Sequence, residues 1–317
     1  MELTGILTQR NWEKRASFDL VYAWEDSFAR NLGIPLRARN RMAEALVRRM
    51  PGKPSLPVRG NLLLMEMEPY VGRNVYNRNN VVPYWVDFFL HEDTLPALVR
   101  SYNACPFIFV SSREVFEFLE NRGTSLPIRH LPLSLPDCFL DGGKEEKVFD
   151  LVMMGRPNEV LAGFFRQYVA SHDCTYAWRK QENGRYRYYD QSGTCLGDMD
   201  THEKYLSLMR KGRVGIYATP GTDSGSGRTA GFSPVTPRFL EYLSAGCHPV
   251  MRYKANADTA FYGLDSICPS VESYEEFETR VDSFLDRPAD TDTYREYLSG
   301  HLTSVRLRRM IQILSQR

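Results

Sequence analysis

Short apolar runs alternate with amphipathic stretches along the whole chain of 317 residues. In the first half, continuous apolar runs predict strands at residues 18–24, 61–67, 81–89 and 107–110. Helical spacing and capping residues predict helices at residues 25–32, 37–49, 94–102 and 111–121. An alternation of buried strands and helices is typical of parallel sheets covered by helices, so the predicted fold class is α/β.

The alternation restarts after a polar connection at residues 137–147. It predicts strands at residues 149–154, 213–218 and 249–251 and helices at residues 159–170, 202–211, 237–245, 271–285 and 294–314. The tyrosine-rich stretch 179–197 is predicted to be a hairpin or a long loop. These two successive units predict two Rossmann-like domains facing across a cleft, at residues 1–137 and 138–300, followed by a terminal helix at 301–317.

Composition excludes several classes of protein. The chain has 40 Lys and Arg against 39 Asp and Glu, so no global field favours a nucleic-acid partner. Its six cysteines form no C-x-x-C pair, which argues against a zinc site or a disulfide framework and for a reducing compartment. The N-terminus lacks a secretory signal, and no run approaches the roughly 18 apolar residues of a membrane span. We expect a cytoplasmic protein, with peripheral contact at the inner membrane face left open.

A glycine-rich loop lies directly before one predicted helix. Residues 219–234 contain four glycines and Arg228, and the helix that follows has Ser233 or Thr236 as its N-cap and Pro237 at its first position. Free backbone N–H groups, an arginine and the positive end of a helix dipole together form an anion site. The alternative is a mobile surface loop before an ordinary capped helix.

The second unit resembles the GT-B glycosyltransferases. Three features carry the resemblance: a strand ending in Gly155-Arg156, a helix followed by the strand 214–218, and Thr236-Pro-Arg238-x-x-Glu241-x-x-x-x-Gly246 before another strand. The last segment is similar to the nucleotide-binding element of the exostosin-like and CgeB-like branches. The resemblance covers the C-terminal half, and it implies that the terminal helix packs back on the N-terminal domain.

The resemblance also implies roles for single residues. The carboxylate of Glu241 would accept hydrogen bonds from the ribose hydroxyls of a donor nucleotide, while Arg238 and the helix N-terminus would hold its diphosphate. Gly155 would allow close approach of the backbone, and Arg156 would offset the charge that develops on the leaving diphosphate. The alternative for Arg238 and Glu241 is an i, i+3 surface ion pair.

The position of Ser233 bears on the stereochemistry. Many retaining GT-B enzymes have a second Glu eight positions before the ribose-binding one, where this sequence has Ser233. Inverting transfer is therefore preferred, and it needs a general base in the first unit. The best candidates are Asp87, in the predicted strand 81–89, and His91; the alternative is that Asp87 caps a turn and His91 lies in a solvated loop. Asp19, Glu25 and Asp26 are weaker candidates.

The prediction is a metal-independent glycosyltransferase without a cofactor, which moves a sugar from a nucleotide diphosphate donor to a saccharide or lipid-linked acceptor. Cell-surface polysaccharide or glycoconjugate assembly is the expected setting. The basic helix 37–49 would attract an anionic acceptor or form a solvated face, and the pair Asp198 and Asp200 is interpreted as incidental rather than metal-binding. The alternatives are a non-catalytic nucleotide- or saccharide-binding partner protein and a sugar-nucleotide epimerase or phosphorylase.

Overall fold

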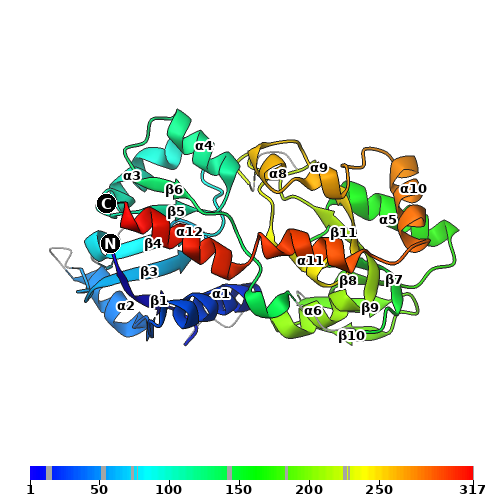
Figure 1. Cartoon of the computed structure of the whole chain (residues 1–317), viewed down its shortest axis with the longest axis horizontal. Helices are drawn as coiled ribbons and strands as arrows, with labels where there is room; N and C mark the ends of the chain where they lie inside the picture. Colours follow the sequence, from blue (N-terminus) through cyan, green and yellow to red (C-terminus); the bar gives the residue numbers. More distant parts are fainter. Residues whose placement is uncertain are drawn as a thin grey trace.

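The computed structural model describes residues 1–11, 16–50, 55–72, 75–76, 78–140, 145–182, 185–223, 227 and 229–316. Two six-stranded sheets, each covered by helices, lie next to one another along the long axis of the molecule (Figure 1). The predicted α/β architecture of two parallel-sheet units is confirmed.

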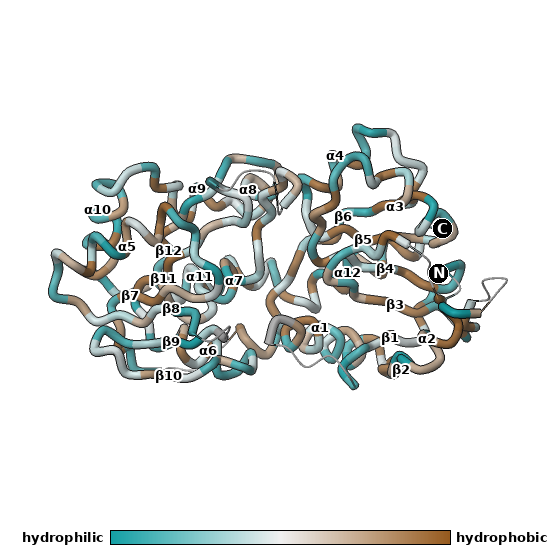
Figure 2. The backbone as a smooth tube through the Cα atoms, turned by 180° about the vertical axis from the view of Figure 1, so that it is seen from behind, coloured by the Kyte–Doolittle hydropathy of each residue, from teal (hydrophilic) through white to brown (hydrophobic). Residues whose placement is uncertain are grey.

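The first sheet is entirely parallel, in the order β2-β1-β3-β4-β5-β6. Its strands are β1 (Leu3–Thr8), β2 (Leu36–Ala38), β3 (Asn61–Glu66), β4 (Val81–Trp85), β5 (Ile108–Val110) and β6 (Ile128–His130). The helices of this unit are α1 (Ala16–Leu32), α2 (Arg41–Arg49), α3 (Leu95–Tyr102) and α4 (Arg113–Asn121), with a short 3₁₀ turn at Glu92–Thr94. The apolar segments of Figure 2 include β3 and β5, which are buried in the sheet.

The second sheet has the order β10-β9-β8-β7-β11-β12. Its strands are β7 (Phe149–Met153), β8 (Tyr176–Glu182), β9 (Arg185–Asp190), β10 (Cys195–Gly197), β11 (Gly212–Ala218) and β12 (His248–Arg252). Its helices are α5 (Glu159–Ser171), α6 (His202–Arg210), α7 (Pro237–Ser244), α8 (Ala257–Phe261), α9 (Leu264–Ile267), α10 (Tyr274–Leu285) and α11 (Thr291–Ser299). The stretch 179–197 contains a hairpin as predicted, since β8 and β9 pair antiparallel.

The predicted strand at residues 18–24 is wrong, because these residues belong to α1. Val21, Trp24 and Phe28 are fully buried, and their spacing of three and four residues places them on one face of a helix. The true first strand, β1, was missed because two threonines and a glycine interrupt its apolar residues. The predicted strand at residues 81–89 is too long, since β4 ends at Trp85.

The predicted terminal helix at residues 294–314 is two helices, α11 and α12 (Thr303–Ser315), separated at Gly300. Leu307, Met310, Ile313 and Leu314 of α12 pack into the apolar core of the first unit. Figure 1 shows this helix, in red, at the first unit. The chain therefore returns to the unit from which it started, as predicted.

The two connections between the units run side by side. The backbone N–H of Leu135 donates to the carbonyl of His301 at 2.9 Å, and that of Thr303 donates to the carbonyl of Leu135 at 2.9 Å. The indole N–H of Trp24 donates to the carbonyl of Ser134 at 2.9 Å, so α1 fixes the outgoing connection. These contacts hold the units in a defined relative position.

Candidate functional site

The predicted donor residues that the structure describes gather where the order of the second sheet reverses, between β7 and β11. Strand β8, which follows β7 along the chain, lies on one side of β7, whereas β11 lies on the other. Ligands of open α/β sheets bind at the carboxyl ends of the strands next to such a reversal. Gly155 follows β7 and the loop before α7 follows β11. Figure 2 shows α7 on the side of the second unit that faces the first.

Gly155 and Arg238 are in direct contact. Gly155 has a φ of 69°, in the left-handed region that favours glycine. A Cβ added to it would lie 2.3 Å from Nη2 of Arg238 and 2.5 Å from its Cζ, so only a glycine allows the guanidinium to lie there. The Arg238 Nη1 donates to the carbonyl of Arg156 at 3.5 Å. The structure thus brings together three of the predicted donor residues, with the exposed Arg156 at the edge.

Four tyrosines interact electrostatically with the Arg238 guanidinium. Burial acts to lower its pKa, but the tyrosines outweigh burial and raise the pKa above its ordinary value. In decreasing order of effect, these are Tyr205, Tyr242, Tyr188 and Tyr217. Two of them also accept backbone hydrogen bonds beside Gly155: Tyr188 from the N–H of Gly155 at 2.8 Å and Tyr242 from that of Met154 at 3.1 Å. The guanidinium is therefore a permanent cation.

Glu241 lies one turn further along α7, where it is buried. Its Oε1 is 2.7 Å from Nε2 of His202, the first residue of α6. The backbone N–H of His202 is bonded in turn to Asp19 of α1 in the first unit, at 3.1 Å. Glu241 and Arg238 are not paired with each other in the contacts described, so the predicted surface ion pair does not describe them. His202 engages one carboxylate oxygen of Glu241 and fixes its orientation.

The loop before α7 is closed by a cluster of hydroxyl groups. The Oγ of Ser233 is 2.7 Å from Oγ1 of Thr219 and 3.2 Å from Oγ1 of Thr222, and all three residues are buried. Thr236 is the N-cap of α7 but makes no side-chain cap bond; its N–H donates to the Tyr217 hydroxyl at 3.0 Å. The predicted donor residue Arg228 lies outside the described residues.

The sequence-based prediction missed several residues that border Arg238. Tyr188 and Arg179 belong to the β8–β9 hairpin, and the ring of Tyr186 lies 3.9 Å from the Arg179 guanidinium carbon. Burial is the main cause that lowers the pKa of Arg179, and Arg238 adds to it. The sequence marked this hairpin only by its many tyrosines, and a high tyrosine content does not show that the hairpin lies next to Arg238.

A buried carboxylate, Asp258, and a partly buried one, Glu114, connect the carboxyl edges of the two sheets. Asp258 of α8 accepts from the backbone N–H of Arg113 at 2.7 Å and from the hydroxyl of Ser112, so it caps α4 of the first unit. Conversely, Glu114 of α4 accepts from the N–H of Ser233 at 2.8 Å. Burial is the main cause that raises the pKa of both carboxyls. These bonds join the loop before α7 to the first unit.

Phe232 adds an apolar contact to the same junction. It is buried against Phe118 of α4 and Phe88, with ring centroids 5.2 and 5.7 Å away. Asp87 precedes Phe88, and its side chain is partly exposed. This predicted base therefore lies just beyond β4, next to the contact with the second unit, and not within a strand as predicted. His91 is exposed, and its carbonyl accepts from the N–H of Thr94 at 3.0 Å.

Glu25 has a strongly perturbed pKa at the reversal point of the first sheet, beside the carboxyl end of β1. Burial is the main cause that raises it to about 7, against the hydrogen bond from Thr8 and the charge of Arg10. The Thr8 hydroxyl donates to Oε2 of Glu25 at 2.5 Å, and Nη2 of Arg10 donates to the same oxygen at 3.3 Å. Perturbed buried carboxyls of this kind are candidate functional groups.

We expect Glu25→Gln to remove a pH dependence of stability. The folded pKa of Glu25 is raised from 4.5 to about 7, so its contribution to stability is complete below pH 4.5 and is lost as the pH rises through 7. Relative to the variant, the wild-type protein should lose about 3 kcal/mol of unfolding free energy over this range. Urea denaturation at pH 4.5 and pH 8 measures the difference.

Asp26→Asn is the matched control for this prediction, because Asp26 pairs with the same Arg10 at 2.9 Å but is half exposed. Its stability difference from the wild-type protein should change little between the two pH values. If the difference in unfolding free energy between Glu25→Gln and the wild-type protein also stays constant between the two pH values, the raised pKa does not belong to Glu25.

Within the described residues, no group of three or more His, Cys, Asp or Glu side chains is arranged to hold a metal ion. Asp198 pairs with Arg187 at 2.9 Å and Asp200 with Lys204 at 2.7 Å. None of the described helices has both the length and the hydropathy to cross a membrane.

Comparison with solved structures identifies the fold of this protein. No protein-family model and no curated protein matches this sequence. A UDP-forming α,α-trehalose-phosphate synthase from Burkholderia vietnamiensis is similar in structure, with a TM-score of 0.50 and 13% identity over 98% of this chain and 87% of that one. The enzyme from Burkholderia xenovorans, in complex with glucose-6-phosphate, has a TM-score of 0.51 and 13% identity over 94% of this chain and 83% of that one. At this identity the likeness shows the fold, and the predicted GT-B fold is confirmed; the CgeB-like or exostosin-like branch stays a prediction.

Proposed function

We propose that this protein is a glycosyltransferase that moves a sugar from a nucleotide diphosphate donor, bound by the C-terminal unit, to a saccharide or lipid-linked acceptor held by the N-terminal unit. The observation that carries the proposal is the contact of Arg238 with Gly155, at the reversal point of the second sheet and at the start of α7. At such a position, a guanidinium fork, backbone N–H groups and the positive end of a helix are all available to bind an anion. The similar Burkholderia structures, described as UDP-forming, support a nucleotide donor.

The donor residues have separate roles in this proposal. Arg238, Arg156, Arg228 and the start of α7 at Thr236 bind the diphosphate, and Gly155 lets it approach the backbone. Glu241, held by His202 at 2.7 Å, accepts hydrogen bonds from the ribose hydroxyls. Ser233 acts through its place in the loop, because its hydroxyl is already bonded to Thr219 and Thr222.

The transfer step is proposed to be an inverting displacement without a metal or a cofactor. An acceptor hydroxyl attacks the anomeric carbon, the bond to the diphosphate breaks, and the hydroxyl proton passes to a general base. Asp87 is the proposed base, because it follows β4 at the edge that contacts the second unit through Phe88. His91 is the second candidate. The diphosphate leaves as a dianion or trianion that Arg156 and Arg238 neutralise.

A panel of sugar nucleotides tests the proposed function. A donor that binds should raise the unfolding temperature, and release of nucleoside diphosphate together with a new glycoside should follow when acceptor is added. Binding without release of nucleoside diphosphate would favour the alternative of a non-catalytic partner protein. An altered sugar nucleotide in place of a glycoside would favour an epimerase.

Asp87→Asn is expected to lower the rate constant of transfer by at least about a hundredfold, because the amide cannot accept the acceptor proton. The dissociation constant of the donor should stay within about twofold, since Asp87 belongs to the other unit. Stopped assays of nucleoside diphosphate release and calorimetry measure the two quantities. Retained turnover would move the assignment to His91, for which His91→Gln is the corresponding variant.

The exposed surface of helix α2 supports the proposal that the acceptor is lipid-linked and that the protein binds at the inner membrane face. Met42, Leu46 and Met50, spaced by four residues, are 84, 63 and 43% exposed, so they form one apolar stripe. Arg41, Arg48 and Arg49 of the same helix are exposed as well. An apolar stripe bordered by arginines suits a membrane surface that carries anionic lipids.

We expect Met42→Ser with Leu46→Ser to reduce binding to vesicles of phosphatidylglycerol and phosphatidylcholine by at least about tenfold, because two apolar side chains no longer enter the bilayer. Sedimentation with the vesicles measures the bound fraction. Ile311→Ser, at another exposed apolar residue of the same unit, is the control. Equal binding of the wild-type protein and the double variant would exclude α2 as the docking surface.

A further inference from the structure

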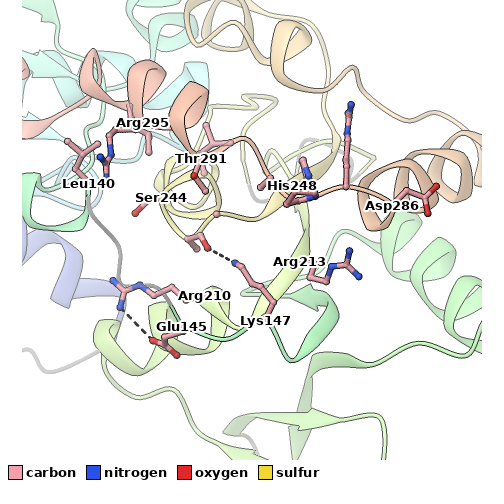
Figure 3. A pocket seen from close by; sticks show the side chains of 17 residues that line it. Leu140, Glu145, Lys147, Arg210, Arg213, Ser244, His248, Asp286, Thr291 and Arg295 are labelled. Carbon is pink, nitrogen blue, oxygen red and sulfur yellow. Dashed lines mark hydrogen bonds and ion pairs between the residues drawn. The ribbon is translucent and has the colours of Figure 1, made fainter.

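The second unit has a pocket of about 540 Å³ on the side opposite the donor residues. It is lined by Ala245 and Gly246, which follow the carboxyl end of α7, and by Arg213 and His248 near the amino ends of β11 and β12. The donor residues lie at the carboxyl ends of the same strands and at the amino end of α7. The pocket is therefore separate from the donor site and lies near the opposite end of α7. Figure 3 shows the side chains that line it.

Positive charge dominates the lining of this pocket. Five basic side chains line it, namely Lys147, Arg210, Arg213, Arg287 and Arg295, against two acidic ones, Glu145 and Asp286. The side chains converge from five separate segments of the chain: the one before β7, the end of α6, the start of β11, the one after α10, and α11. Such a concentration of cations is unfavourable unless an anion offsets it.

Among these cations, Arg210 and Arg213 pair with carboxylates, and Nη1 of Arg213 is 3.4 Å from Oδ1 of Asp150. Nη1 of Arg210 is 3.9 Å from Glu145 and 3.6 Å from Glu203, distances at the long end for an ion pair. Lys147 donates to the carbonyl of Ala245 at 2.7 Å, the contact marked by a dashed line in Figure 3. A carbonyl oxygen carries no net charge, so the cation of Lys147 stays available to a ligand. Burial acts to lower the pKa of Lys147 and thus also favours a compensating anion.

His248 supplies an unsatisfied polar atom in the wall of the pocket. Its ring is buried and stacks on Phe284 at 4.4 Å, and its Nδ1 is 3.1 Å from the Tyr294 hydroxyl. Its Nε2 is buried without a hydrogen-bond partner among the described groups. When the Tyr294 hydroxyl donates to Nδ1, the ring proton is on Nε2, on the side of the backbone of Arg287 and Pro288, which favours the protonated ring.

We propose that this pocket is a second anion-binding site, for a small molecule that carries a phosphate or diphosphate group. The volume suits a sugar phosphate or a nucleotide, since ligand pockets are commonly about 300–1,000 Å³. Lysine and arginine side chains that converge from different elements bind phosphate oxygens through charge-assisted hydrogen bonds. Lys147 contacts the carbonyl of Ala245, whose N–H donates to the carbonyl of Glu241 at 2.8 Å, so a bound phosphate acts on the helix that carries Glu241 and, in its first turn, Arg238.

Pyrophosphate is the probe for the test, in buffers matched in ionic strength with sodium chloride. We expect the wild-type protein to show two binding events by calorimetry, one at each end of α7. Arg238→Ala should remove the donor-site event and leave the other. In that background, Lys147→Ala with Arg287→Ala should weaken the remaining event by at least about tenfold, through the loss of two charge-assisted contacts.

Arg280→Ala is the matched control, because Arg280 and Arg287 both lie over the Phe284 ring, at 5.9 and 5.7 Å, and only Arg287 lines this pocket. The control variant should keep the affinity for pyrophosphate within about twofold. A single binding event that Arg238→Ala abolishes would overturn the proposal. An unchanged second event in the Lys147 and Arg287 double variant would overturn it as well. Unfolding temperatures measured without pyrophosphate distinguish loss of the site from loss of the fold.

Discussion

Arg238→Ala is expected to lower the affinity for nucleoside diphosphate and the kcat/KM of transfer by at least about a hundredfold each, the effect of losing two charge-assisted hydrogen bonds to phosphate. The structure places the guanidinium against Gly155 and 3.5 Å from the carbonyl of Arg156, near the start of α7, where it can meet an anion. Calorimetry with UDP and other nucleoside diphosphates measures the affinity.

Two further variants make this prediction specific. Arg238→Lys keeps the charge but loses the planar fork, so its loss of affinity should be intermediate. Arg166→Ala removes an exposed arginine of α5 in the same unit and should leave the affinity unchanged. If Arg238→Ala is folded, as judged by its unfolding temperature, and binds nucleotide as the wild-type protein does, the donor site lies elsewhere.

Gly155→Ala is expected to weaken donor binding by at least about tenfold and to lower the free energy of unfolding by about 1–2 kcal/mol. The stability loss follows from the φ of 69°, which alanine adopts only at a cost. The binding loss follows from the new Cβ, which would lie 2.3 Å from Nη2 of Arg238 and must displace the guanidinium. Urea denaturation and nucleotide calorimetry measure the two effects.

Gly163→Ala is the matched control within the same unit. Gly163 lies inside α5, and a Cβ added to it meets no atom within 4 Å. This substitution should stabilise the protein by about 0.5–1 kcal/mol, because alanine is the better helix residue, and should leave donor binding unchanged. Donor binding by Gly155→Ala at the wild-type affinity would mean that the contact with Arg238 has no part in the site.

Local patterns were sufficient for most of the elements. The caps Ser112, Asn158 and Thr201 and the apolar runs of β3, β5 and β7 depend on neighbours within a few residues, so periodicity and capping rules identify them. The same rules failed at α1, where a continuous run of five apolar residues, 20–24, resembled a strand. In the structure, Val21, Trp24 and Phe28 are buried on one face of a helix. They also failed at β1. This strand lies between β2 and β3 in the sheet, and local patterns do not report contacts with these distant segments.

The sequence by itself determined the α/β class, two successive units, and the helix that carries Arg238 and Glu241 after a glycine-rich loop. Only the tertiary structure decided what surrounds these two residues. Gly155 contacts Arg238, which lies 83 positions later in the sequence. Tyr188 of the β8–β9 hairpin accepts a hydrogen bond from Gly155, and His202 of α6 is bonded to Glu241. The reason is physical: capping and periodicity act over a few residues, whereas these contacts depend on strand order and on the crossings that bring the carboxyl ends of β7, β8 and β11 together.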